Sequence, residues 1–195
     1  MAVSYFDQVK KEASAAGIKN NTKKSMKWFR EKLIYMTDIS RSKILKDSAL
    51  QKANTPLVGR MFMYFYDPKH KKTLPFYDRF PLILMVDKAP GGFYGLNLHY
   101  LDPILRAAFF DRLLEFTNNK KYDKTTRLRL SYDMLKAASK LKEFEPCFKH
   151  YLTSNIKSQI TEVPASEWEV AIFLPTEQFT KSSKANVWKN SKSII

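Results

Sequence analysis

The segment from Arg60 to Tyr66, RMFMYFY, constrains the fold more than any other part of the sequence. Side chains alternate between the two faces of a strand, and here both faces carry aromatic or long apolar side chains. Such a segment predicts a strand that is covered on both of its faces. A chain of 195 residues with 44% hydrophobic residues can bury a core of that kind as one domain.

The segments that follow predict two more strands joined by turns. Residues 67–73 (DPKHKKT) form a polar, positively charged loop, and residues 74–87 are extended because two prolines exclude a helix. Within that stretch, residues 81–86 predict a buried strand. A strong turn signal at residues 89–92 precedes a further strand over residues 93–101. The sequence therefore predicts an antiparallel meander of three strands.

Two helices are predicted before these strands. Ser4, followed three residues later by Asp7, resembles a capping start, and Gly17 supplies a stop. A second helix, from Thr22 to about Asp38, is amphipathic and basic because apolar residues recur every three or four positions among lysines. Residues 40–55 are polar and predict either a third short helix or a linker.

The second half of the chain returns to helices and then to strands. Asp102 and Pro103 form a cap residue and a first helical position, and the helix they begin ends before Asn118. Further helices are expected over residues 134–143 and 146–152, and further strands over residues 158–163 and 168–174. The order predicts an α+β fold with a mainly antiparallel β-sheet body, an N-terminal helical arm and packed helices.

The formal net charge of +15 is concentrated at the two ends of the chain. Residues 1–55 carry 12 basic and 5 acidic side chains, and residues 181–195 carry 4 basic and no acidic ones. These counts divide the chain into a basic helical arm (1–55), an α+β body (56–180) and a basic tail (181–195). Because surplus cations repel each other, the distribution predicts a polyanionic partner; charge kept only for solubility is the plainer alternative.

Several classes of protein do not fit the composition. One Cys cannot form an internal disulfide, and it fits a reducing compartment best. The longest uncharged apolar run, Phe80 to Val86, is far shorter than the roughly 18 residues that a membrane helix requires. The N-terminus lacks the apolar stretch of a secretion signal. The sequence therefore predicts no membrane partner and no export.

Motifs for a metal, a cofactor or a nucleophile are weak. Cys147 and His150 have half of a zinc-ligand spacing, but nothing brings His70 and His99 to them. The glycines of residues 91–95 join two strands and lack the helix that a phosphate loop requires. No Gly-x-Ser-x-Gly elbow is present. We therefore expect no enzyme activity, no catalytic residues, no metal and no cofactor.

A metal-dependent nuclease remains the least favoured alternative. Such an enzyme needs clustered carboxylates that hold a divalent metal near a lysine. Asp67, Pro68 and Lys69 follow the first strand and have this local character. Candidates for the second ligand are Asp47, Asp78 and Asp87. The same residues would also occur in an ordinary polar loop between strands.

Binding to nucleic acid accounts best for the charge. Lysines alternate with aromatic residues in residues 23–35, where Trp28 and Phe29 either face exposed bases or anchor the helix in the core. No motif for reading a base sequence is present, so contacts to phosphates are expected. The candidate DNA-binding residues are Lys10, Lys11, Lys19, Lys23, Lys24, Lys27 and Arg30 on the arm, Lys69, Lys71, Lys72 and Arg79 on the body, and Lys181, Lys184, Lys189 and Lys192 on the tail.

Several strings in the sequence resemble one known family. They are YDPK (66–69), LPFYDRFP (74–81), GFYGLNLHYL (92–101), KHYL (149–152), PASEW (164–168) and IFLPTEQF (172–179). Together they span roughly residues 60–190 and resemble the DNA end protector, or head completion, proteins of T-even-type contractile-tailed phages.

This resemblance implies a protein of the virion, assembled in the host cytoplasm, that acts after DNA packaging. It would bind the ends of double-stranded DNA at the portal vertex, in the head-tail region, and keep exonucleases from them. The family has no agreed catalytic residues, so Asp67, Asp78, Arg79, Asn97 and His99 are expected to hold loops. The alternative is a structural adaptor of the neck or tail that binds portal, neck or other virion proteins.

Overall fold

An antiparallel sheet of six strands forms the centre of the computed structural model within residues 4–117, 133, 137 and 142–193, which the structure describes. The strand order is β1-β7-β2-β4-β5-β6, and β3 and β8 form a separate pair. The strands are β1 (Gln51–Ala53), β2 (Met61–Met63), β3 (Tyr77–Asp78), β4 (Leu82–Ala89), β5 (Gly92–Asn97), β6 (Phe148–Leu152), β7 (Ile160–Val163) and β8 (Phe179–Thr180).

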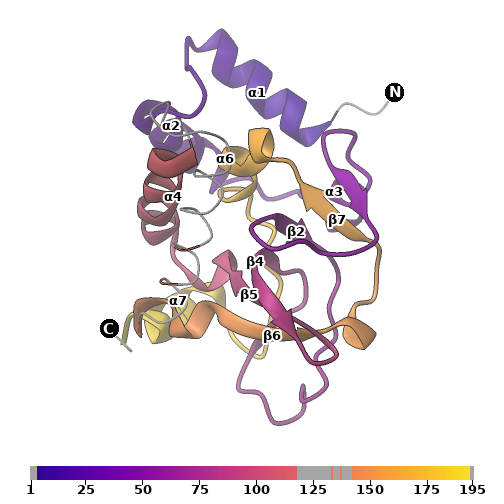
Figure 1. Ribbon diagram of the computed structural model, residues 1–195. Coiled ribbons are helices and arrows are strands. Elements are labelled where there is room, and N and C mark those ends of the chain that lie inside the picture. The colour runs from indigo at the N-terminus through magenta and orange to yellow at the C-terminus, as the bar shows by residue number, and fades with distance from the viewer. Residues whose placement is uncertain (1–3, 118–132, 134–136, 138–141, 194–195) are drawn as a thin grey trace.

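Helices from both ends of the chain gather around this sheet (Figure 1). The α-helices are α1 (Tyr5–Ala15), α2 (Lys23–Leu33), α3 (Arg41–Ile44), α4 (Pro103–Thr117), α6 (Trp168–Ala171) and α7 (Lys184–Ser193). Short 3-10 helices are η1 (Leu98–Tyr100), η2 (Lys142–Cys147), η3 (Thr153–Asn155) and η4 (Ala165–Glu167). In the part of the chain that is described, none of the helices is both long and apolar enough to span a bilayer. The α+β fold is therefore confirmed.

Strand β2 is covered on both faces, as its sequence predicts. Met61 and Met63 lie in the main core with Phe6 of α1 and Phe29 of α2. The alternate side chains, such as Phe62, lie in a second apolar cluster on the other face of the sheet. Strand β2 pairs with β4 and β4 pairs with β5, both antiparallel, so the predicted meander is confirmed.

Local capping fixes the starts of three predicted helices. Ser4 Oγ accepts a hydrogen bond from the backbone N–H of Asp7 at the start of α1. Thr22 and Ser25 form a reciprocal capping box at the start of α2. Asp102 Oδ1 accepts hydrogen bonds from two backbone N–H groups in the first turn of α4, at 2.8 and 2.9 Å. These caps satisfy donors that a helix end leaves without a partner.

Two predicted elements were wrong. Residues 148–152 form strand β6, paired with β5, in place of the expected helix over 146–152. Residues 168–171 form helix α6 in place of the expected strand over 168–174. All side chains from Trp168 to Leu174 are buried, including Glu169, and a wholly buried run has no period that separates strand from helix. Most of the helix expected over residues 134–143 lies outside the described residues.

The strand expected over residues 93–101 ends early, at Asn97. The Asn97 side chain accepts a hydrogen bond from the backbone N–H of His99 at 3.1 Å, and this bond begins the 3-10 helix η1. Asparagine competes in this way for backbone donors that a strand would otherwise pair. The chain therefore turns at Asn97 and places His99 in the interior.

The basic ends of the chain pack on the body. Phe6 and Phe29 of the N-terminal helices are fully buried in the main core, and β1 pairs with β7 at one edge of the sheet. At the other end of the chain, Val187 of α7 is buried and Trp188 Nε1 donates to the carbonyl of His99. The divisions at residues 55 and 180 stay a prediction.

Gly92 permits close approach of β5 to β6. A Cβ at this position would lie 1.8 Å from the carbonyl oxygen of Tyr151. We expect Gly92→Ala to separate the two strands and to lower the free energy of unfolding by about 3 kcal/mol. Gly17→Ala is the control, because a Cβ there meets nothing within 4 Å and only its positive φ of 67° opposes the change. Urea unfolding of both variants tests this, and equal losses would contradict it.

Candidate nucleic-acid interface

Cations from distant parts of the sequence meet at the loop between β2 and β3. The pairing of β3 with β8 brings the start of the tail beside this loop. Lys181 Nζ donates to the carbonyl oxygens of Lys72 and Leu74, at 2.9 and 3.0 Å. Lys69, Lys71 and Lys72 of the loop are exposed, as is Lys181. We call these four lysines the loop cluster.

The loop is held in place near its start. The backbone N–H of Asp67 donates to the Asn155 carbonyl at 3.0 Å, and the Asn155 side chain donates to the Asp67 carbonyl at 2.6 Å. The Asp67 carboxylate pairs with Lys71 at 2.8 Å. The hydrogen bond from Lys71 lowers the pKa of Asp67, and the same bond raises the pKa of Lys71. Within the described chain Lys69 and Lys72 have no carboxylate partner, so they remain open to an anion.

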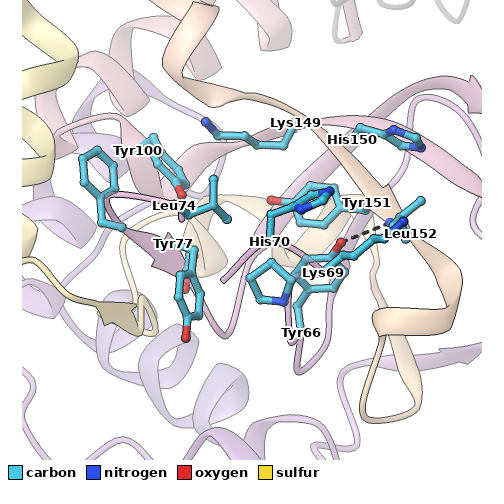
Figure 2. A pocket seen from close by; sticks show the side chains of 13 residues that line it. Tyr66, Lys69, His70, Leu74, Tyr77, Tyr100, Lys149, His150, Tyr151 and Leu152 are labelled. Carbon is cyan, nitrogen blue, oxygen red and sulfur yellow. Dashed lines mark hydrogen bonds between the residues drawn. The ribbon is translucent and has the colours of Figure 1, made fainter. Parts of the chain in front are cut away.

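A cavity of about 340 Å³ lies beside the loop cluster (Figure 2). Its wall combines aromatic rings with cationic and polar side chains from the loop, β3, η1 and β6. The lining residues are Tyr66, Pro68, Lys69, His70, Leu74, Phe76, Tyr77, Asp78, Tyr100, Lys149, His150, Tyr151 and Leu152. Rings and cations side by side are suited to bases and phosphates.

Lys149 in this wall is a residue that the sequence analysis missed. It lies in β6, where the sequence predicted a helix, and strand alternation places it on the same side as Tyr151. Its side chain is partly buried, with Nζ 4.7 Å from the ring centroid of Tyr100. Burial lowers the pKa of Lys149. Had residues 149–152 (KHYL) been predicted as a strand, the alternation of side chains would have placed Lys149 on the same face as Tyr151.

Behind the cavity, Asp78 and His99 form a buried hydrogen-bond network. His99 Nδ1 lies 2.6 Å from Asp78 Oδ2, and Asn97 Nδ2 donates to the same oxygen at 3.2 Å. His99 Nε2 lies 3.1 Å from Thr176 Oγ1. Although this resembles the order of a catalytic triad, His99 and Thr176 are fully buried. His99 and Thr176 are therefore shielded from solvent, and the network holds β3, η1 and the segment before β8 together.

The carboxylate of Asp78 also binds the backbone. Its Oδ1 accepts hydrogen bonds from the N–H groups of Phe80 and Gln178, both at 3.0 Å. Burial acts to raise the pKa of Asp78, but His99 and these backbone donors outweigh it, so the pKa is lowered. Arg79, the next residue after Asp78, is exposed, and it lies near the loop cluster because its charge acts to lower the pKa of both Asp67 and Lys71. Asp78 thus ties β3 to the segment that leads into β8.

The candidate residues of the N-terminal arm lie elsewhere. Figure 1 shows α1 and α2 at the opposite end of the molecule from the loop that follows β2. Lys10 pairs with Glu167 at 2.6 Å, and Lys27 lies 4.0 Å from Glu31. Phe29 is fully buried and Trp28 packs edge-on against it, so these aromatic residues anchor the helix. The remaining candidates here are Lys11, Lys19, Lys23 and Lys24, which are exposed, and Arg30, which is half-buried.

The tail candidates divide into anchored and open side chains. Lys184 pairs with Glu177 at 3.4 Å, and Lys192 pairs with Asp102 at 2.6 Å. These two ion pairs attach α7 to the body. Lys189 is exposed and, in the part of the chain described, has no acidic partner. The candidate residues therefore form separate basic areas, of which the loop cluster alone borders the cavity described above.

The carboxylates considered for a nuclease have different partners. Asp47 accepts hydrogen bonds from the backbone of Tyr5 and Ala49, Asp67 pairs with Lys71, and Asp87 accepts from the backbone of Lys88. No three His, Cys, Asp or Glu side chains among the described residues are arranged to hold a metal ion.

The four zinc candidates are divided between the surface and the interior. Cys147 and His99 are fully buried, and burial raises the pKa of Cys147 to about 12. His70 and His150 are exposed at the cavity, where His150 Nε2 lies 3.1 Å from the Pro90 carbonyl oxygen.

Comparison with protein families gives one match. Residues 1–193 match the model of the family described as Phage T4 terminal DNA protecting protein. The match includes the basic helices, the loop cluster, the cavity and α7. No curated protein and no solved structure matches the chain.

Proposed function

We propose, since this chain belongs to the phage T4 terminal DNA protecting protein family, that it binds the ends of packaged phage DNA and shields them from exonucleases. The observation that carries the proposal is the loop cluster, in which exposed lysines from the loop and the tail meet beside a cavity lined by aromatic rings. Lysines can contact DNA phosphates whatever the base sequence. A protein that protects every DNA end must bind in this sequence-independent way.

Protection follows from binding and steric cover, without a catalytic step. A folded body held against a DNA end occupies the place that an exonuclease needs. The exposed lysines of α1 and α2, such as Lys23 and Lys24, supply a second area for phosphate contacts at the far end of the molecule. Two separated basic areas let one protein contact a DNA terminus and the neighbouring DNA.

Completion of the phage head at the portal or neck is the second part of the proposal. It requires contacts with other virion proteins in addition to DNA. Large apolar side chains are exposed at Tyr35 (82%), Ile104 (64%) and Leu57 (51%), and each is available for contacts with another protein. Particles assembled with Tyr35→Ser and Ile104→Ser should retain less of the protein, while the purified variant binds DNA normally. Normal retention in the particle would contradict this part.

Exonuclease protection tests the main proposal. The purified protein is added to linear duplex DNA, an exonuclease that enters at duplex ends is then supplied, and the remaining DNA is measured. We expect protection that short linear duplexes relieve by competition and that closed circular DNA of equal mass relieves far less. Equal competition by the circle would mean general coating, and absence of protection would contradict the proposed function.

A further inference from the structure

The cavity beside the loop cluster has a wall that suits one nucleotide. Figure 2 shows Lys149 and His150 along one side, with Leu74 and Tyr77 across from them and Tyr151 between. Aromatic rings offer flat apolar surfaces, and bases stack on such rings in proteins that hold single strands. A volume of about 340 Å³ lies at the small end of the usual range for ligand pockets, roughly 300 to 1,000 Å³.

The charge of Lys149 indicates what kind of group the cavity takes. This lysine is partly buried and, in the described chain, pairs with no carboxylate. A cation withdrawn from water without a counter-ion is unfavourable, and an anionic ligand would remove that cost. The nearest acidic residue in the wall, Asp78, has its oxygens committed to His99, Asn97 and backbone donors. Among the described residues, no carboxylate is therefore available to Lys149, and an anionic ligand would supply the missing counter-charge.

Hydrogen-bond donors accompany the lysine. The hydroxyl oxygen of Tyr66 accepts a hydrogen bond from the backbone N–H of Leu152 at 3.1 Å, which leaves the hydroxyl hydrogen available to donate. Burial raises the pKa of Tyr66, so the hydroxyl keeps that hydrogen. Lys69 at the edge of the cavity adds a second cation. Lysine and hydroxyl donors together suit the oxygens of a phosphate.

We propose that this cavity receives the 5′-terminal nucleotide of a DNA strand, with its phosphate monoester at Lys149 and its base against the aromatic wall. This inference rests on the proposed function, because a DNA end supplies the nucleotide. A duplex lying along the surface presents internal phosphates to the loop cluster, whereas only a strand end can insert its last nucleotide. The cavity thus distinguishes an end from the middle of a DNA molecule. The same chemistry occurs in free nucleoside monophosphates.

The test compares two blunt duplexes that differ only in a 5′-phosphate or a 5′-hydroxyl. Affinities are measured by fluorescence anisotropy for the intact protein, for Lys149→Met and for the control Lys52→Met. Lys52 is an exposed residue of β1, at the sheet edge opposite β6, so both variants lose one positive charge. We expect the intact protein and the control to prefer the 5′-phosphate about tenfold, the contribution of one charge-assisted hydrogen bond.

Lys149→Met should lose this preference while remaining folded. Because methionine replaces an unpaired, partly buried charge, the thermal unfolding midpoint should stay the same or rise. If the intact protein binds both duplexes equally and still protects linear DNA, the cavity assignment is wrong and the proposed function stands. Retained preference in Lys149→Met would also overturn the assignment. Absence of both binding and protection would overturn the proposed function and, with it, this inference.

The last part of the test measures binding of free deoxyadenosine monophosphate. If this nucleotide binds in a Lys149-dependent way while the two duplexes bind equally, the cavity is a site for free nucleotides and the DNA-end assignment is overturned. If the phosphorylated duplex binds far more tightly than the free nucleotide, the additional contacts come from the loop cluster, as the inference expects.

Discussion

Reversing three charges beside the cavity is expected to lower the affinity for linear duplex DNA by about 100-fold or more at low salt. The variant carries Lys69→Glu, Lys72→Glu and Arg79→Glu. These side chains are exposed, so the fold should tolerate the changes. Each substitution removes a proposed phosphate contact and adds repulsion. Lys181 is left unchanged because it holds the loop through two backbone carbonyls. Anisotropy titration measures the loss.

The matched control reverses three exposed lysines on another part of the surface. Lys43→Glu, Lys46→Glu and Lys52→Glu change the net charge by the same amount but lie near α3 and β1. We expect this control to bind several-fold more weakly than the intact protein and far more tightly than the variant at the loop. Equal losses would mean that overall charge, without any particular surface, determines binding.

Asp78→Asn should lower the free energy of unfolding by about 3 to 5 kcal/mol, because it removes a buried carboxylate that accepts several hydrogen bonds. The carboxylate is 4% exposed and binds His99, Asn97 and two backbone N–H groups. An amide of the same size cannot accept at both positions. Urea unfolding measures the change, with the exposed Asp38→Asn as a control that should shift it by less than about 0.5 kcal/mol. Similar values for both variants would contradict the role of Asp78.

The same residue gives an expected pH dependence. The pKa of Asp78 is lower in the folded protein than in the unfolded chain, where an aspartate has a pKa of about 3.9. Its stabilising contribution is therefore fully present above that value and is lost as the pH falls through the lower pKa of the folded state. The intact protein should lose more stability than Asp78→Asn as the pH falls below about 4. Parallel stability curves would contradict this expectation.

Segments with a clear period or a specific turn residue could be predicted from the sequence. The two apolar faces of β2, the turn before β5 and the cap at Asp102 are local features, and each has the predicted structure. Residues 168–174 could not be predicted, because a run that is buried on every side fits a helix as well as a strand. For residues 148–152, pairing with β5 at the sheet edge prevailed over the local preference for helix.

The candidate site was only partly accessible to sequence reasoning. The charge of the loop and of the tail identified Lys69, Lys72 and Lys181 individually, but only the pairing of β3 with β8 shows that they meet. The sequence around Lys149 contains no cluster of cations that would mark it as a binding residue. Its proposed role rests on partial burial without a counter-ion among the described residues, which only the fold reveals. The ion pairs of Lys10, Lys184 and Lys192 likewise depend on distant carboxylates.

The salt dependence of binding to linear duplex DNA tests the central claim most directly. If the loop cluster and Arg79 grip phosphates, the logarithm of the affinity should fall linearly with the logarithm of the salt concentration, with a slope of about −0.9 for each phosphate neutralised. The Lys69, Lys72 and Arg79 variant should then show a slope shallower by up to about 3, because three contacts are lost. A flat response in the intact protein, or the same slope in both proteins, would contradict the account.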